Sequence, residues 1–147
     1  MNLKLGEIEV NDFLLKSDTT KYELIKNLKI QSYDSDDDPI ALFTIEQANV
    51  DRYTFDIDIY FIDNRLYKIK LEPVNLEMKN TGYPDEKYQN KKKKITDSFL
   101  YANLGAPLKE TKAVLYYEFD WGSISSVAFF SGRNEFTGGF VEIKYKK

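Results

Sequence analysis

Apolar and polar residues alternate most regularly along residues 52–62, which read RYTFDIDIYFI. Successive side chains of a β-strand point to opposite faces of a sheet, so this segment has one apolar face and one polar face. The pattern is typical of an antiparallel strand with one face on the core and the other in solvent. The polar face carries Asp56, Asp58 and Tyr60.

A return strand follows directly. Asp63-Asn64 predicts a turn, and residues 65–73 alternate in the same way as the strand before them. The alternation predicts three inward side chains: Tyr67, Ile69 and Leu71. Lys68 and Lys70 then point outward, and we expect one of the two to lie across the hairpin from Asp58.

Two segments have the spacing of amphipathic helices. The first covers residues 20–28, where Thr20 stands three residues before Glu23, as in a capping box. The second covers residues 85–103 and ends at Gly105, a residue suited to the left-handed position after a helix. Its predicted apolar stripe consists of Tyr88, Ile95, Phe99 and Ala102.

The remaining strands are predicted from shorter alternating runs at residues 3–10, 29–33, 40–45, 112–121, 123–131 and 137–145. The element order is therefore β-α-β-β-β-β-α-β-β-β. Runs of strands interrupted by two helices favour an α+β fold, with a mainly antiparallel sheet and both helices packed on one face. A length of 147 residues is that of one ordinary domain, so we expect a single domain over residues 1–147.

The composition excludes several classes of site. The chain contains no Cys and no His. This removes disulfides, Ser-His-Asp and Cys-His catalysis, and zinc, haem or iron–sulfur sites with their usual ligands. A catalytic centre would need carboxylates, Lys, Arg, Ser, Thr or Tyr, and we expect no cofactor.

The N-terminal sequence MNLKLGEIEVNDFLL is interrupted by charged residues and has no small-residue cleavage site. It therefore predicts no signal peptide. No stretch of the sequence approaches the ~18 apolar residues of a membrane-spanning helix. With Met1 as the native start, these features predict a cytoplasmic protein without a membrane partner.

Charge is distributed unevenly along the chain. Residues 1–64 carry a net charge of −8 and residues 65–147 carry +5, within an overall −3. Two clusters produce most of this difference: the acidic run Asp34, Asp36, Asp37 and Asp38, and the basic run Lys91 to Lys94. Taken alone, the acidic run is most simply a solvated loop and the basic run a solvated helix face.

Neither cluster has the pattern of a specific ligand site. The acidic run offers the oxygen ligands of Ca²⁺ or Mg²⁺ but lacks the Gly and Glu positions of an EF-hand, so we predict no metal site. Four successive lysines on a helix point in most directions around it. Together with a pI near 5.1, they disfavour a nucleic-acid partner.

Asp56 and Asp58 are the one candidate catalytic pair. Residues two apart on a strand point the same way, with Cα atoms about 6.5–7 Å apart. Paired carboxylates at such separations act as acid and base in glycoside hydrolysis. The simpler interpretation is a solvent-facing row, because the acid of such a pair needs burial to raise its pKa.

Aromatic residues are abundant, with 11 Tyr, 10 Phe and 1 Trp. The strand patterns place three of them on outward faces beside acidic residues: Tyr60, Tyr116 and Phe140. Exposed tyrosine is a frequent anchor of protein interfaces, and neighbouring acids attract a basic partner.

Several segments carry a resemblance to a known group. They are LKLGEIEV, DTTKYELIKNL, DIDIYFIDNRLYKIKL, YANLGAP and YYEFDWGSISSVAFFSGRNEFTGGFVEIKY. Together they resemble small bacterial immunity-type proteins, which neutralise a cognate toxin of a competition system. The shared features are structural, namely turn glycines, strand alternation and the Trp121-Gly122 turn. The resemblance implies a binder without a catalytic site and transfers no functional residue.

The main hypothesis is a non-catalytic protein-binding module, specifically a bacterial immunity protein that neutralises a basic toxin such as a nuclease. The predicted partner-binding residues are Asp34, Asp36, Asp37, Asp38, Asp56, Asp58 and Tyr60. One alternative is a carboxylate-type hydrolase that uses Asp56 and Asp58. Another is a scaffold domain that self-associates through a sheet edge, although lysines at the end of the last strand disfavour edge pairing.

Overall fold

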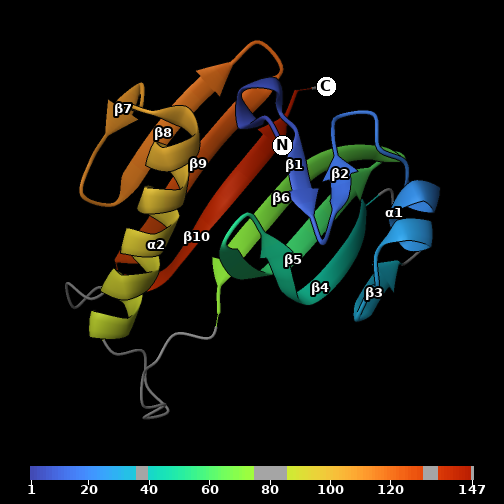
Figure 1. Cartoon of the computed structure of the whole chain (residues 1–147), viewed down its shortest axis with the longest axis horizontal. Coiled ribbons are helices and arrows are strands. Elements are labelled where there is room, and N and C mark those ends of the chain that lie inside the picture. The colour runs from blue at the N-terminus through green and yellow to red at the C-terminus, as the bar shows by residue number, and fades with distance from the viewer. Residues whose placement is uncertain (36–39, 75–85, 131–135, 147) are drawn as a thin grey trace.

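The computed structural model describes residues 1–35, 40–74, 86–130 and 136–146 (Figure 1). Its helices are the 3₁₀ helix η1 (Leu3–Leu5), α1 (Lys21–Asn27) and α2 (Glu86–Leu104). Its strands are β1 (Ile8–Val10), β2 (Phe13–Leu15), β3 (Ser32–Ser35), β4 (Ile40–Val50), β5 (Tyr53–Ile62), β6 (Arg65–Pro73), β7 (Lys109–Glu110), β8 (Val114–Phe119), β9 (Gly122–Phe130) and β10 (Phe136–Tyr145). The predicted α+β class is confirmed.

Eight of the strands form one antiparallel sheet in the order β3-β4-β5-β6-β10-β9-β8-β7. The sheet has two meanders, β3 to β6 and β7 to β10, which meet where β10 pairs with β6. Figure 1 shows these two strands side by side in the middle of the molecule. This central pairing brings residues about 70 positions apart in the chain into contact.

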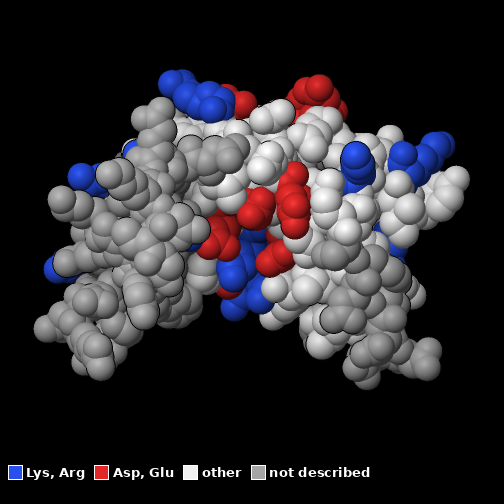
Figure 2. All heavy atoms as spheres, turned by 90° about the horizontal axis from the view of Figure 1, so that it is seen from below, with Lys and Arg blue, Asp and Glu red and all other residues white. Residues whose placement is uncertain are grey.

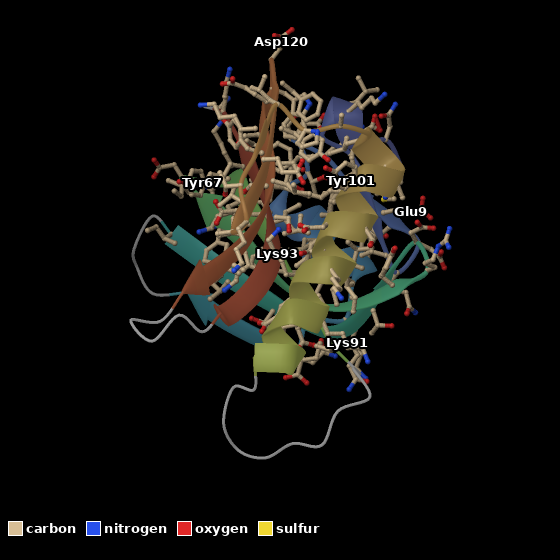
Figure 3. All side chains as sticks on the ribbon, turned by 90° about the vertical axis from the view of Figure 1, so that its left-hand side faces the viewer. Glu9, Tyr67, Lys91, Lys93, Tyr101 and Asp120 are labelled. Atoms are coloured by element: carbon tan, nitrogen blue, oxygen red, sulfur yellow. The ribbon has the colours of Figure 1, made fainter. Side chains whose placement is uncertain are left out.

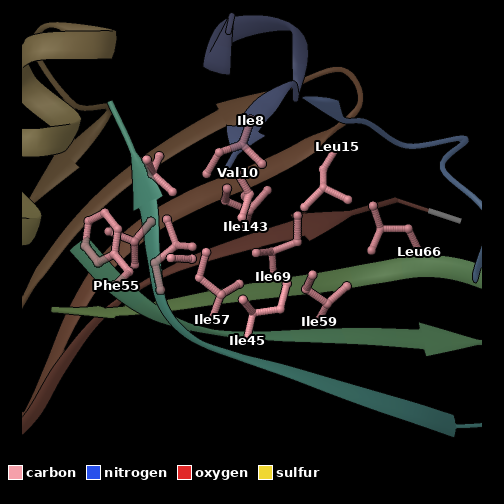
Figure 4. Close-up of a cluster of buried hydrophobic side chains, with 14 of the residues drawn as sticks. Ile8, Val10, Leu15, Ile45, Phe55, Ile57, Ile59, Leu66, Ile69 and Ile143 are labelled. Carbon is pink, nitrogen blue, oxygen red and sulfur yellow. The ribbon is translucent and has the colours of Figure 1, made fainter. Parts of the chain in front are cut away.

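One face of the sheet is covered and carries the core. Helix α2 lies across β10 and β9, and the separate β1–β2 hairpin packs beside it (Figure 1). Figure 4 shows hairpin residues Ile8, Val10 and Leu15 directed at Ile69 and Ile143 of the sheet. All five of these side chains are buried. Burial of this apolar surface, at about 25 cal/mol per Å², holds the helix and the hairpin on the sheet.

The side of helix α2 that faces the sheet is more polar than the predicted apolar stripe. Phe99 is buried and packs edge-on against Phe55, with ring centroids 5.4 Å apart. The basic run, however, is not a solvated face throughout: Lys92 and Lys93 are each only 6% exposed, while Lys91 and Lys94 are exposed. That part of the prediction is wrong, because the helix lies on the sheet along its lysine-bearing side.

Each buried lysine has an acidic partner. Lys92 donates to Glu72 of β6 at 2.6 Å, and Lys93 donates to Asp97 one helical turn further on. Figure 3 shows Lys93 between α2 and the strands. The same Asp97 oxygen accepts a hydrogen bond from Ser126 of β9 at 2.6 Å, and Ser126 also contacts the Thr96 hydroxyl at 2.6 Å. This buried network joins α2 to the sheet.

Two local predictions are corrected by the structure. Residues 3–10 do not form one strand: η1 precedes β1, and Gly6 ends it with φ of 75°. The Trp121 ring lies against Gly6 and donates from Nε1 to the Lys4 carbonyl at 2.8 Å, which holds this turn. In β6, a register shift between Tyr60 and Phe61 buries Leu66 and leaves Tyr67 half-buried, whereas Ile69 and Leu71 point inward as predicted.

The predicted start of the first helix is confirmed. Thr20 caps α1, its hydroxyl accepts from the Glu23 N–H at 3.1 Å, and the Glu23 carboxylate accepts from the Thr20 N–H at 3.0 Å. These are the two hydrogen bonds of a capping box.

Among the described residues, no helix combines the length and apolar character needed to cross a membrane.

Two core tyrosines predict a loss of stability in alkaline solution. Burial raises the pKa of Tyr145, whose hydroxyl donates to the Gly6 carbonyl at 2.8 Å, and it raises the pKa of Tyr117 to about 12. In the unfolded chain both phenols ionise near pH 10. Between pH 10 and 12 the unfolded state therefore releases protons that the native state keeps, and the free energy of unfolding falls as pH rises.

Urea unfolding between pH 9 and pH 12 measures this slope. Tyr145→Phe removes one of the two phenols and is expected to make the slope shallower. Tyr22→Phe, at a position 73% exposed on α1, is the control and should keep the wild-type slope. Identical slopes in Tyr145→Phe and wild-type protein would contradict the assignment.

Candidate binding face

The second face of the eight-stranded sheet, called here the open face, carries polar, charged and aromatic side chains. The helices and the β1–β2 hairpin contribute their buried residues to the core on the other face. One row of the open face crosses six strands from β4 to β8 and consists of Thr44, Asp58, Lys70, Glu142, Ser125 and Tyr116. The next row consists of Leu42, Tyr60, Lys68, Lys144, Ser123 and Glu118. The predicted placement of a lysine across from Asp58 is confirmed by Lys70.

Asp56 and Asp58 project from β5 and are half-buried. Asp56 accepts a hydrogen bond from the Gln47 N–H at 3.0 Å, at a point where the register of β4 shifts and Gln47 adopts φ of 53°. Asp58 accepts one from the Thr44 hydroxyl at 3.0 Å. Both donors are neutral, so they orient the carboxylates without cancelling their charge.

The lysines across from Asp58 and Tyr60 lie over aromatic rings. The Lys70 ammonium lies 4.4 Å from the centroid of the Phe140 ring, and that of Lys68 lies 4.5 Å from the Tyr60 ring. Such cation–π contacts contribute about 0.5–1 kcal/mol at exposed sites. Within the described residues, no lysine or arginine nitrogen lies within 4.0 Å of the Asp56 or Asp58 carboxylate. The two negative charges are thus available to a cation from outside.

Tyr60 stands at the boundary between charged and apolar positions. Burial raises its pKa, and the negative charges of Asp58 and Glu142 raise it further. The phenol therefore stays protonated through the physiological range and can donate a hydrogen bond. Glu142 itself pairs with Lys144 at 3.2 Å.

Apolar side chains flank the charged rows on both sides. On β4 and β5 they are Ile40, Leu42 and Ile62; on β8, β9 and β10 they are Val114, Val127 and Phe140. Ile40 is 51% exposed, and the other five are half-buried. Viewed from below, acidic and basic side chains lie beside one another in a hollow at the middle of the molecule (Figure 2). The open face thus combines a charged centre with apolar margins.

The structure brings together part of the predicted binding set. Asp56, Asp58 and Tyr60 lie on the open face, and the backbone of Asp34 pairs with Leu42 in the strand next to Tyr60. The Asp34 side chain and the residues Asp36, Asp37 and Asp38 lie outside the described part of the structure. Tyr116 and Phe140 are on the open face as predicted.

Sequence reasoning missed the contribution of β10 to this surface. Glu142 and Lys144 lie beside Lys70 and Lys68 because β10 pairs with β6. The alternation of charged and apolar residues in VEIKYKK was a signal that these two side chains share a face. It carried no information about which strand would be their neighbour.

Within the described residues, no group of three or more Asp, Glu, His or Cys side chains could hold a metal ion. The geometry of the open face favours recognition by charge and shape. Comparison with protein-family models, with curated proteins and with solved structures finds no match to this chain.

Proposed function

We propose that this chain is a non-catalytic protein-binding module that holds its partner on the open face. The observation that carries the proposal is the pair Asp56 and Asp58, held in place by neutral donors and left without a described ion-pair partner. Tyr60 beside them and the apolar margins supply the contact area that interfaces need. Protein interfaces combine such apolar and aromatic anchors with oriented polar groups.

The partner that suits this face is a basic protein. The first 64 residues of the chain carry a net charge of −8, and charge of one sign accelerates the approach of a partner of opposite sign. With the resemblance noted above, this supports a cytoplasmic bacterial immunity protein that binds and neutralises a basic toxin.

Reversing the charge of the pair tests the binding face. Tagged wild-type protein is expected to retain one basic polypeptide from a lysate of its own cells in moderate salt. Asp56→Lys/Asp58→Lys should lose that polypeptide, and with the purified partner its association rate should fall at least about tenfold. Mass spectrometry and stopped-flow kinetics are the two measurements.

Asp120→Lys is the control, because it makes one such charge reversal at an exposed position between β8 and β9. Asp120 lies at the tip of the molecule, where Figure 3 labels it. This variant should bind like wild type. If the double variant binds with wild-type rate and affinity, the open face is not the binding surface.

Neutralisation is a separate test of the immunity role. The captured polypeptide, expressed alone, should arrest growth, and co-expression of wild-type protein should restore it. Co-expression of Asp56→Lys/Asp58→Lys should fail to do so. A partner that binds but is harmless would leave the binding function standing and remove the immunity role.

A further inference from the structure

A pocket of about 570 Å³ lies at one end of the sheet. It is enclosed by the loop between β2 and α1, the turn between β5 and β6, and the end of β10. Its volume falls within the range of small-molecule sites, about 300–1,000 Å³. None of the residues of the charged rows defined above lines it, and it shares only Ile62 with the apolar margins of the open face.

The walls of this pocket are fixed by hydrogen bonds and by turn geometry. Tyr145 is held by the bond from its hydroxyl to the Gly6 carbonyl. The buried Thr19 hydroxyl accepts from the Lys16 N–H at 2.9 Å, which closes the loop before α1. Asp63 and Asn64 have φ of 50° and 66°, as in the tight two-residue turns of β-hairpins. The pocket is therefore preorganised.

The lining has an apolar part and a polar rim. Leu66 and Tyr145 are buried, and Ile62 and Tyr67 are half-buried. The buried Thr19 and exposed polar residues, with Arg65 among them, complete the lining. This arrangement suits a ligand with an apolar body and a polar group at one end.

Two cations at the rim can bind that polar group. Arg65 and Lys146 both line the pocket, and among the described residues no carboxylate lies within 4.0 Å of either cation. Two carboxylates, Asp18 and Asp63, also line it, so the four charges of the lining sum to zero. Within the described part of the chain, Arg65 and Lys146 nevertheless remain without a carboxylate partner and can bind an anionic group.

We propose that this pocket binds a small organic acid, a molecule with an aromatic or aliphatic body and a single carboxylate. The two rim cations without a described carboxylate partner, Arg65 and Lys146, suit a monoanion. Guanidinium binds a carboxylate through two parallel hydrogen bonds, and this assigns Arg65 as the anchor of the ligand. The apolar body then lies against Leu66, Tyr67 and Tyr145.

Titration with phenylacetate tests the site, with ¹⁵N-labelled protein followed by NMR. Saturable shifts in the millimolar range are expected at the amides of residues 64–67 and 146. The neutral isostere phenylacetamide and the cation phenethylamine should shift these amides far less. The absence of saturation up to about 20 mM would overturn the proposal, since even a weakly efficient ligand of this size binds in that range.

Arg65→Gln supplies the second arm of the test. It should weaken phenylacetate binding about tenfold or more, because it removes the charge and the paired donors. Arg52→Gln makes the same change at an exposed position between β4 and β5 and should bind like wild type. Equal binding of phenylacetamide, or unchanged binding by Arg65→Gln, would show a merely apolar pocket and refute the acid site.

Discussion

Asp97→Ala is expected to lower the free energy of unfolding by about 1–3 kcal/mol, because it leaves the buried Lys93 without its partner while the Asp97 side chain itself is 29% exposed. Asp97 is the carboxylate beside the buried ammonium of Lys93 and also accepts from Ser126 at 2.6 Å. Alanine supplies neither the charge nor the acceptor. The lysine is then left in the interface between α2 and β9, where leaving a charge without its partner is strongly unfavourable.

Urea denaturation of a small set of variants separates the two roles of Asp97. Asp97→Asn keeps an oxygen for Ser126 but removes the charge, so its loss should be smaller than that of the alanine variant. Lys93→Met/Asp97→Ala should be more stable than Asp97→Ala alone, because methionine removes the stranded charge and keeps an apolar stem. A loss below about 1 kcal/mol in Asp97→Ala would contradict the network.

The parts of the fold that sequence predicts well are those set by local patterns. The β5–β6 hairpin follows from two alternating runs and the turn residues between them. Helix α1 follows from Thr20 and Glu23, whose reciprocal hydrogen bonds involve neighbours only. Information within about ten residues is enough to specify such elements.

Two errors in the fold involve distant partners, whereas the error at Tyr67 comes from a register shift within the β5–β6 hairpin. A run of lysines carries no local sign of burial. Lys92 of α2 can be buried because Glu72 of β6 forms an ion pair with it. Residues 3–5 alternate like a strand but form η1, since Trp121 packs on the following turn. Neither partner can be identified before the strands are arranged.

For the open face too, sequence predicts what local alternation sets and misses what distant strands contribute. The alternation along β5 is enough to place Asp56, Asp58 and Tyr60 on one face. It cannot show that Lys70 prefers the Phe140 ring to the neighbouring Asp58, because Phe140 arrives through the pairing of β10 with β6. That contact leaves Asp58 without a lysine partner among the described residues. The sequence could therefore locate the site but could not show that its carboxylates are free to bind a partner.

Of the glycines whose surroundings the structure describes, Gly122 should tolerate substitution by alanine least. A Cβ built at Gly122 would lie 2.0 Å from the backbone carbonyl oxygen of Lys144, far inside contact distance. The strand β10 cannot retreat to make room, since Ile143 and Tyr145 on either side of Lys144 are buried in the core. We expect a loss of more than about 3 kcal/mol, at or beyond the upper end of over-packing effects.

Gly105→Ala is the control that isolates this contact. Gly105 ends α2 with φ of 76°, and no atom lies within 4 Å of the position that a Cβ would take. Alanine there meets only the backbone penalty of the left-handed region, about 1–2 kcal/mol. In thermal and urea unfolding, Gly122→Ala should therefore be much less stable than Gly105→Ala. The reverse order would mean that β9 and β10 adjust freely at their shared end, which the buried neighbours of Lys144 argue against.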